Sequence, residues 1–489
     1  MPLRSDLERK LLHSSAWNAL SYGGTQILTF GLMIVLARLL TPADFGLVTL
    51  ASLPLLALGY LQESGLGAAV IKRRADVERA AATQLVFAAL SSLVLYVASF
   101  AAAPLLARVF SQPALTSVFR VLALTLVVRG AMAVPATLLE RDLAFDKRAR
   151  GDVAGILTQT VVSIACAAGG LGVWSLVAGQ VANVAVQAAV YWMLTPLRPS
   201  PRLASWSMLR ELGRYGRHIT ASNVLLLVND NADNAVIGRL LGASSVGVYN
   251  LAWRLSNLPA TQVSFIISRV TFAVYAELQD DLDQFRAVFL TTLRRIAFLS
   301  IPLALGILIA AKPIVVAIFG ETWKPAVVPL QVLAIFGMSR TFAGVTSAVF
   351  QASGRPQLNY QLGLWHSAVL FSSLYLLARR FGVEGVAWAE VAASVSTMIP
   401  CYFFATRILE LPLRELLGEL AMPAFCSLTV AGSLLATRVA VTPLDPAVQL
   451  VVLVAIGLGA YGAAMLTFGR HELSTIVRTF TARRPATEP

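Results

Sequence analysis

Long apolar stretches alternate with short polar segments along the whole chain. A helix needs about 20 apolar residues to cross a bilayer, so each stretch of this length predicts one membrane-spanning helix. The predicted spans lie near residues 16–37, 45–62, 82–103, 115–139, 152–169, 173–195, 218–238, 246–268, 288–310, 326–350, 360–378, 385–406, 418–437 and 446–468. The pattern therefore predicts an all-α, polytopic membrane protein with about 14 transmembrane helices.

Composition agrees with this pattern. The chain is 57% hydrophobic and 13% charged, whereas a soluble globular protein has about 25% charged residues. Its three cysteines all fall inside predicted spans, and its four histidines cluster with no other potential ligand. We therefore expect no disulfide framework, no metal site and no cofactor.

The net charge of +13 reflects topology rather than nucleic-acid binding. With both termini in the cytoplasm, the cytoplasmic segments and helix ends hold 27 of the 39 Lys and Arg residues, and the opposite side holds 8. This asymmetry is what the positive-inside rule predicts for a multi-pass membrane protein with cytoplasmic termini.

The chain also contains an internal repeat. Residues 37–51 (ARLLTPADFGLVTLA) align without gaps on residues 238–252 (GRLLGASSVGVYNLA), with six identities at an offset of 201. Two further pairs of segments align in the same order at offsets of up to 211. We predict two pseudo-symmetric six-helix lobes, 1–200 and 201–410, joined by a basic linker at 197–218. A C-terminal helix pair and a cytoplasmic tail follow, over 411–489. Transporters built from such repeats bind substrate near the midplane and alternate access.

Two of these segments also carry a family resemblance. The stretches LARLLTPADFGLVTLA and ADNAVIGRLLGASSVGVYNLAWRLSNLP resemble the patterns of bacterial oligosaccharide flippases, and so do LLERDLAFDKRA and GLGVWSLVAGQ. These flippases form the polysaccharide-transport family of the multidrug/oligosaccharidyl-lipid/polysaccharide exporter superfamily. The resemblance covers most of the chain up to about residue 410. It implies that the substrate is a polyprenyl-diphosphate-linked oligosaccharide, moved from the cytoplasmic to the periplasmic leaflet.

Four arginines lie inside predicted spans: Arg120, Arg129, Arg254 and Arg340. Each would cost about 2.5–3.5 kcal/mol at the bilayer centre, so they are expected to face a cavity or a partner. Guanidinium groups grip phosphate oxygens bidentately, which makes all four candidates for binding the diphosphate in a cavity between the lobes. The alternative is that they pair with internal carboxylates and lock helices together. For Arg120, near a membrane interface, snorkelling is a further alternative.

Two carboxylates, Asp230 and Asp233, interrupt the seventh predicted span and share one helix face. Three interpretations stay open. They could couple transport to H⁺ or Na⁺, neutralise an intramembrane arginine such as Arg254, or lie hydrated at the outer mouth. Asp233 matches the family pattern, whereas Asp230 does not.

The sequence contains no catalytic constellation and no P-loop, because GRLLGASS lacks the required Gly-Lys-Ser/Thr end. We therefore expect a transporter rather than an enzyme, with membrane lipid and polysaccharide polymerase or export machinery as further partners. A cation-coupled multidrug exporter on the same architecture is the first alternative, although it would favour an acidic cavity. A membrane polysaccharide polymerase or glycosyltransferase is the second, although no large outer loop is predicted.

Overall fold

The computed structural model describes the backbone of residues 23–63 and 65–467. It describes their side chains except those of residues 63, 213–230 and 259–273. The chain divides into two compact units, residues 1–247 and 248–489. The lobe boundaries near residues 200 and 410 stay predictions.

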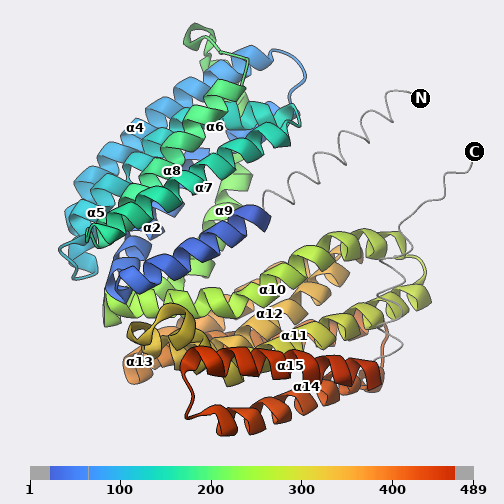
Figure 1. Cartoon of the computed structure of the whole chain (residues 1–489). Coiled ribbons are helices and arrows are strands. Elements are labelled where there is room, and N and C mark those ends of the chain that lie inside the picture. Colours follow the sequence, from blue (N-terminus) through green and yellow to red (C-terminus); the bar gives the residue numbers. More distant parts are fainter. Residues whose placement is uncertain (1–22, 64, 468–489) are drawn as a thin grey trace, which may run out of the picture. The chain divides into compact units, whose positions relative to one another are not determined.

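The first unit is helical throughout its described part (Figure 1). It begins with a helix over Gly23–Leu39. The elements that follow are α2 (Pro42–Glu63), α3 (Leu66–Lys72), α4 (Val77–Val109), α5 (Leu115–Leu122), α6 (Leu124–Arg141), α7 (Phe145–Ala168), α8 (Val173–Leu194), the short 3₁₀ helix η1 (Pro201–Leu203) and α9 (Trp206–Leu241). The unit ends at Gly247, in the first turns of α10 (Ala243–Glu277).

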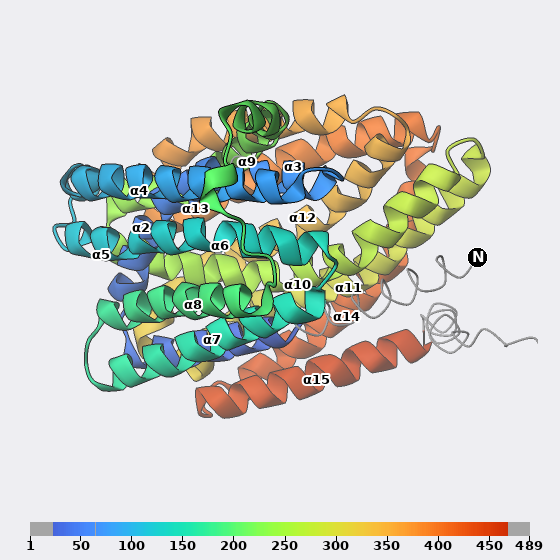
Figure 2. The same ribbon diagram turned by 90° about the horizontal axis from the view of Figure 1, so that it is seen from above.

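Within this unit, α7 and α8 form a tight antiparallel pair, and α6 packs against α4 and α8 (Figure 2). Outward-facing positions are apolar: on α4, Val94 is 65% exposed and Val97 is 57% exposed. Apolar exposure of this extent suits contact with lipid tails rather than with water. The buried residues of α4 are all Ala, Ser, Thr or Gln, so this helix packs through small and polar side chains and presents large apolar ones outwards.

The repeated segments meet each other inside the first unit. A Cβ atom placed on Gly46 of α2 would lie 1.7 Å from the carbonyl oxygen of Ala243, and one on Gly247 would lie 1.9 Å from that of Pro42. Pro42 and Ala243 are themselves repeat-related, as are Gly46 and Gly247, at the same offset of 201. The contact is thus reciprocal, and only glycine allows this approach of two backbones.

The second unit consists of the rest of α10, α11 (Leu282–Phe319), the 3₁₀ helix η2 (Glu321–Ala326), α12 (Val327–Ala352), α13 (Gln357–Ile408), α14 (Leu413–Val441) and α15 (Pro446–Thr467). Its main core packs α11 against α12 and the start of α14, with Phe289, Leu293 and Val349 completely or almost completely buried. On α15, Val451 is 68% exposed and Leu458 is 69% exposed, again as expected of a lipid-facing surface.

The predicted fold class is confirmed. Ten helices in the described part of the chain are long and apolar enough to cross a membrane. The 52-residue α13 covers two predicted spans, and Gly382 interrupts it between them with φ 61° and ψ −139°. The number of fourteen spans stays a prediction.

One boundary differs from the prediction. The segment expected as a linker at 197–218 becomes helical at Trp206, where α9 begins. Ser205 caps this helix, its hydroxyl accepting a hydrogen bond from the Met208 backbone N–H at 3.5 Å. Hydropathy fails to detect this extension because its residues are polar, whereas a capping serine and buried Met208 and Leu212 suffice to fold it.

Candidate functional site

A line of polar side chains runs along one face of α8. Gln180, Asn183, Gln187 and Tyr191 follow one another at spacings of three and four residues, which keeps them on the same side of a helix. On the neighbouring helix α7, Asp152 and Gln159 lie two turns apart and face them, as their hydrogen bonds show. Amides and a carboxylate are costly in a membrane-spanning pair of helices unless they have partners.

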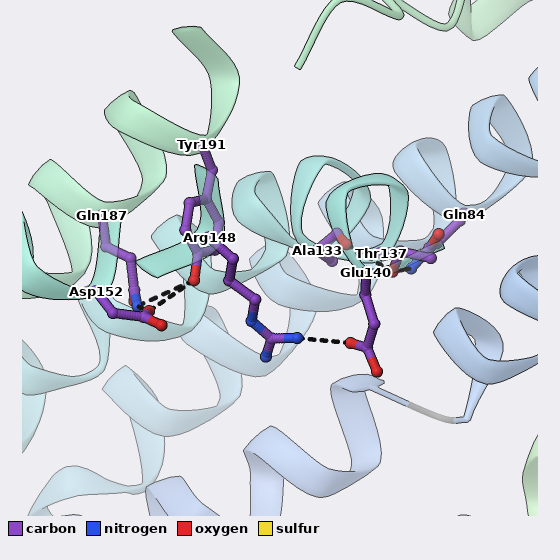
Figure 3. Close-up of polar contacts among 8 residues, drawn as sticks. All are labelled: Gln84, Ala133, Thr137, Glu140, Arg148, Asp152, Gln187 and Tyr191. Atoms are coloured by element: carbon purple, nitrogen blue, oxygen red, sulfur yellow. Dashed lines mark hydrogen bonds and ion pairs between the residues drawn. The ribbon is translucent and has the colours of Figure 1, made fainter. Parts of the chain in front are cut away.

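At one end of this line, Asp152 is an acceptor shared by two donors (Figure 3). Its Oδ1 accepts a hydrogen bond from the Tyr191 hydroxyl at 2.7 Å and a second from the Gln187 side-chain amide. The Tyr191 side chain is 2% exposed. Two neutral donors thus stabilise this carboxylate, and the guanidinium of Arg148 lies close enough to interact with it electrostatically.

Beside it, Arg148 and Glu140 form an ion pair across the turn between α6 and α7 (Figure 3). The distance from Nη1 of Arg148 to Oε2 of Glu140 is 2.7 Å, and the side chains are 37% and 45% exposed. The pair is thus partly hydrated, and each charge compensates the other.

These groups line a cavity of about 440 Å³, which we call the ion-pair cavity. Gln84 also reaches it, and its Nε2 donates to the Thr137 hydroxyl at 3.0 Å. The described side chains lining this cavity carry two positive and two negative charges, on Arg129, Arg148, Glu140 and Asp152. Its formal charge therefore sums to zero.

A second cavity of about 440 Å³ adjoins the first, and we call it the amide cavity. The two cavities share the lining residues Gly59, Tyr60, Arg129 and Gln187. The polar side chains lining the amide cavity are Ser52, Tyr60, Thr125, Arg129, Gln159, Gln180, Asn183 and Gln187. Among its described lining residues Arg129 is the one formal charge, so this cavity is cationic.

Glycines on α7 set the positions of these side chains. A Cβ on Gly151 would lie 2.4 Å from the ring of Tyr191, and one on Gly155 would lie 2.7 Å from Oδ1 of Asn183. Two glycines four residues apart form a groove on a helix, into which the partner helix packs closely. The GDVAG segment thus allows Tyr191 and Asn183 to lie directly against α7.

Of the predicted diphosphate-binding residues, Arg129 and Arg120 belong to the first unit. Arg129 lines both cavities and makes no hydrogen bond or ion pair with the residues that the structure describes. Arg120 instead has local partners: its Nε donates to the Phe100 carbonyl at 3.3 Å, and its guanidinium lies 4.2 Å from the centre of the Phe100 ring. The role predicted for each stays a prediction, but their surroundings differ.

Arg340 and Arg254 belong to the second unit. The guanidinium of Arg340 lies 5.9 Å from the ring centres of both Trp253 and Phe336, at the outer limit of a cation–π contact. Arg254 donates from Nε to Oδ1 of Asn250, one turn earlier on α10, at 2.9 Å. Neighbouring residues leave both side chains exposed. Their predicted role in binding diphosphate stays a prediction.

The two predicted acidic residues lie on α9. Asp233 is 2% exposed, and its Oδ1 accepts from the backbone N–H of Asn234 at 2.7 Å and from the side-chain amide of Asn234 at 3.2 Å. The side chain of Asp230 lies outside the described residues. Ion coupling and charge neutralisation at this pair both stay predictions.

Within the described residues, no group of three or more His, Cys, Asp or Glu side chains could hold a metal ion. Asp152, Glu140 and Arg148 were not predicted as site residues. Glu140 and Arg148 lie in the polar connection between the predicted spans 115–139 and 152–169, and Asp152 lies at the start of the second span. A signal was present in the polar line of α8, whose spacing of three and four residues matches one helix face.

The fold defines the class of the protein: a multi-pass α-helical membrane protein. It resembles the structure of the lipid II flippase MurJ in its inward closed conformation, with a TM-score of 0.75, 13% identity and coverage of 93% of this chain and 99% of that one. It also resembles an inward-facing multidrug resistance transporter of the MATE family, with a TM-score of 0.64, 17% identity and coverage of 79% and 96%.

The family follows from the sequence. Residues 35–328 match the model of the family described as "polysaccharide biosynthesis protein", so the chain belongs to this family. The chain is also 26% identical over 435 residues to the lipopolysaccharide biosynthesis protein WzxC of Escherichia coli K12, covering 86% of both chains. The recognised family resemblance is confirmed.

Proposed function

We propose that this protein is a flippase that moves polyprenyl-diphosphate-linked oligosaccharides from the cytoplasmic to the periplasmic leaflet of the bacterial inner membrane. Its family and its relative WzxC belong to polysaccharide biosynthesis, and its fold resembles that of a lipid II flippase. The duplicated segments support an alternating-access mechanism without a catalytic step. The distribution of Lys and Arg supports cytoplasmic termini.

The observation that carries this proposal is the position of Arg129. It lies near the middle of the span formed by α5 and α6, and it lines the amide cavity as the one charge among the described lining residues. Placing a guanidinium in the bilayer centre costs about 2.5–3.5 kcal/mol, so such a group is a candidate for binding a ligand. A diphosphate group would bind there with charge-assisted hydrogen bonds, each worth about 1.5–3 kcal/mol.

The charges around Arg129 also favour one direction of approach. Asp152 contributes a negative charge to the ion-pair cavity, where Glu140 already compensates Arg148. The lining of the amide cavity includes Arg129 but not Asp152. An anion bound there is therefore attracted by Arg129 without a carboxylate in the lining of the same cavity to repel it. We therefore place the diphosphate on the amide-cavity side of Arg129.

The multidrug exporter is the competing function, since a MATE transporter shares the fold. An exporter of cationic drugs requires a net negative binding site, because unlike charges attract across a low-dielectric cavity. The described lining of the amide cavity offers the opposite sign. The charge of this cavity therefore favours an anionic cargo.

One experiment separates the two functions. The purified protein is placed in liposomes that contain a fluorescent polyprenyl-diphosphate oligosaccharide, and in parallel in liposomes loaded with a cationic dye. We expect the lipid to appear in the opposite leaflet, and dye efflux to be no faster than in liposomes without the protein. Efflux of the dye along a proton or sodium gradient, without movement of the lipid, would establish the exporter instead.

A further inference from the structure

The amide cavity holds more hydrogen-bonding groups than the protein itself uses. Gln180 of α8 lines the cavity, and its side chain makes no hydrogen bond to the residues that the structure describes. The same holds for the hydroxyl of Tyr60 on α2. Polar groups inside a membrane protein are costly when they lack partners, so these groups point to a ligand or to water.

Two further amides are held in place but only partly satisfied. Nδ2 of Asn183 donates to Oε1 of Gln159 at 2.6 Å, which fixes both side chains across the α7–α8 pair. This bond leaves the NH₂ group of Gln159 as a donor and the side-chain oxygen of Asn183 as an acceptor, since each amide offers both kinds of group. The close approach at Gly155 further fixes Asn183. The cavity is therefore a built site rather than an accidental gap.

The chemistry of these groups selects the ligand class. Each amide presents two N–H donors and one carbonyl acceptor, and a sugar hydroxyl is both a donor and an acceptor, so the two match without a net charge. A cationic drug would meet no carboxylate among the described lining residues. The volume of about 440 Å³ lies within the range of roughly 300–1,000 Å³ typical of small-molecule sites.

We propose that the amide cavity binds a sugar residue of the lipid-linked cargo, with Gln180, Gln159 and Asn183 as hydrogen-bonding partners of its hydroxyls. This inference rests on the proposed function. The first sugar of such a cargo is joined directly to the diphosphate, so its binding site must adjoin the diphosphate site. Arg129 lines the same cavity and meets this requirement. The amides of the cavity thus distinguish one sugar from another, while Arg129 binds the diphosphate that is common to all such lipids.

The test compares the affinities of lipids that differ only in their sugar. Binding to the purified full-length protein is measured for polyprenyl diphosphate alone and for the same lipid carrying glucose, galactose, N-acetylglucosamine or N-acetylgalactosamine. At least one sugar-bearing lipid should bind roughly tenfold more tightly than the bare lipid, because a few additional hydrogen bonds supply the free energy for a change of this size. Gln180→Leu should remove most of this preference and leave the affinity for the bare lipid unchanged.

Gln180 is the best position for this test because its replacement breaks no hydrogen bond within the described protein. Gln361→Leu on α13 is the matched control: it removes an exposed amide outside both cavities and should preserve the sugar preference. Asn183→Leu provides a second variant, and its folding is checked by its elution profile and melting temperature. It should abolish the sugar preference even if the melting temperature falls.

The outcomes separate this inference from the proposed function. Arg129→Gln should weaken the binding of bare and sugar-bearing lipids by the same factor. If the wild type binds all five lipids with equal affinity while Arg129→Gln still weakens binding, the sugar site is overturned and the proposed flippase function stands. A sugar preference that survives Gln180→Leu and Asn183→Leu would also overturn it. If Arg129→Gln binds every lipid as tightly as the wild type does, the result instead counts against the proposed function.

Discussion

The reciprocal contact of Gly46 and Gly247 makes the sharpest structural prediction. In Gly46→Ala, the new methyl carbon would lie 1.7 Å from the Ala243 carbonyl oxygen, whereas ordinary contacts begin at about 3.4 Å. The two backbones would have to separate by about 1.7 Å, because neither can rotate away like a side chain. Overpacking of this kind costs about 1–3 kcal/mol.

The free-energy loss is measured against Gly306→Ala on α11, where a Cβ meets nothing within 4 Å. This control reports the gain of up to about 1 kcal/mol that alanine brings to a helix. Thermal unfolding in detergent should place Gly46→Ala below the control by roughly 2–12 °C.

Gly247→Ala should behave like Gly46→Ala, because its methyl would lie 1.9 Å from the Pro42 carbonyl oxygen. The double variant should lose less than the sum of the single losses, since one separation of the helices relieves both overlaps. A Gly46→Ala protein that melts with the Gly306→Ala control would refute the close approach.

Three further predictions concern charged groups. Asp152→Leu should destabilise the first unit by about 1–3 kcal/mol, because the Tyr191 hydroxyl loses its acceptor; adding Tyr191→Phe should recover part of this in a denaturant titration. Glu140→Gln should lower stability by less than about 1 kcal/mol in the same titration, because the ion pair with Arg148 is partly exposed; a larger loss would show that the pair is structural. If Asp233 couples an ion, Asp233→Asn should make transport in liposomes independent of the driving gradient, and an unchanged dependence would favour charge neutralisation.

Hydropathy predicted the helices well because crossing a bilayer imposes a minimum apolar length. Each predicted span in the described chain is helical, although the span at 115–139 is divided between α5 and α6. The gap between the predicted spans at 360–378 and 385–406 contains the break at Gly382. α9 contains the predicted span at 218–238 but begins at Trp206, about three turns earlier, since its polar first turns carry no hydropathy signal. The repeat at offset 201 was visible in the sequence, but the close contact that Gly46 and Gly247 make with the repeated segments became visible only in the structure.

The site was less predictable than the fold. Arg129 stood out because an arginine in a membrane span is rare, and it does line a cavity. Asp152 and Gln187 did not stand out, because one lies close to a predicted helix end and the other is uncharged. Their pairing depends on the packing of α7 against α8, which the glycines at 151 and 155 allow and which one-dimensional patterns do not show. Residue type therefore indicated where charge is unusual, whereas only packing showed which groups share a cavity.

Replacing Arg129 with alanine tests directly whether this guanidinium is required for lipid translocation. Wild type, Arg129→Ala and the control Arg438→Ala, an exposed arginine on α14, are reconstituted with a fluorescent polyprenyl-diphosphate oligosaccharide. Arrival of the lipid in the opposite leaflet is then followed by quenching with dithionite. We expect rapid translocation by the wild type and by Arg438→Ala, and a rate at least tenfold lower in Arg129→Ala. Translocation by Arg129→Ala at the wild-type rate would show that Arg129 does not bind the diphosphate during transport.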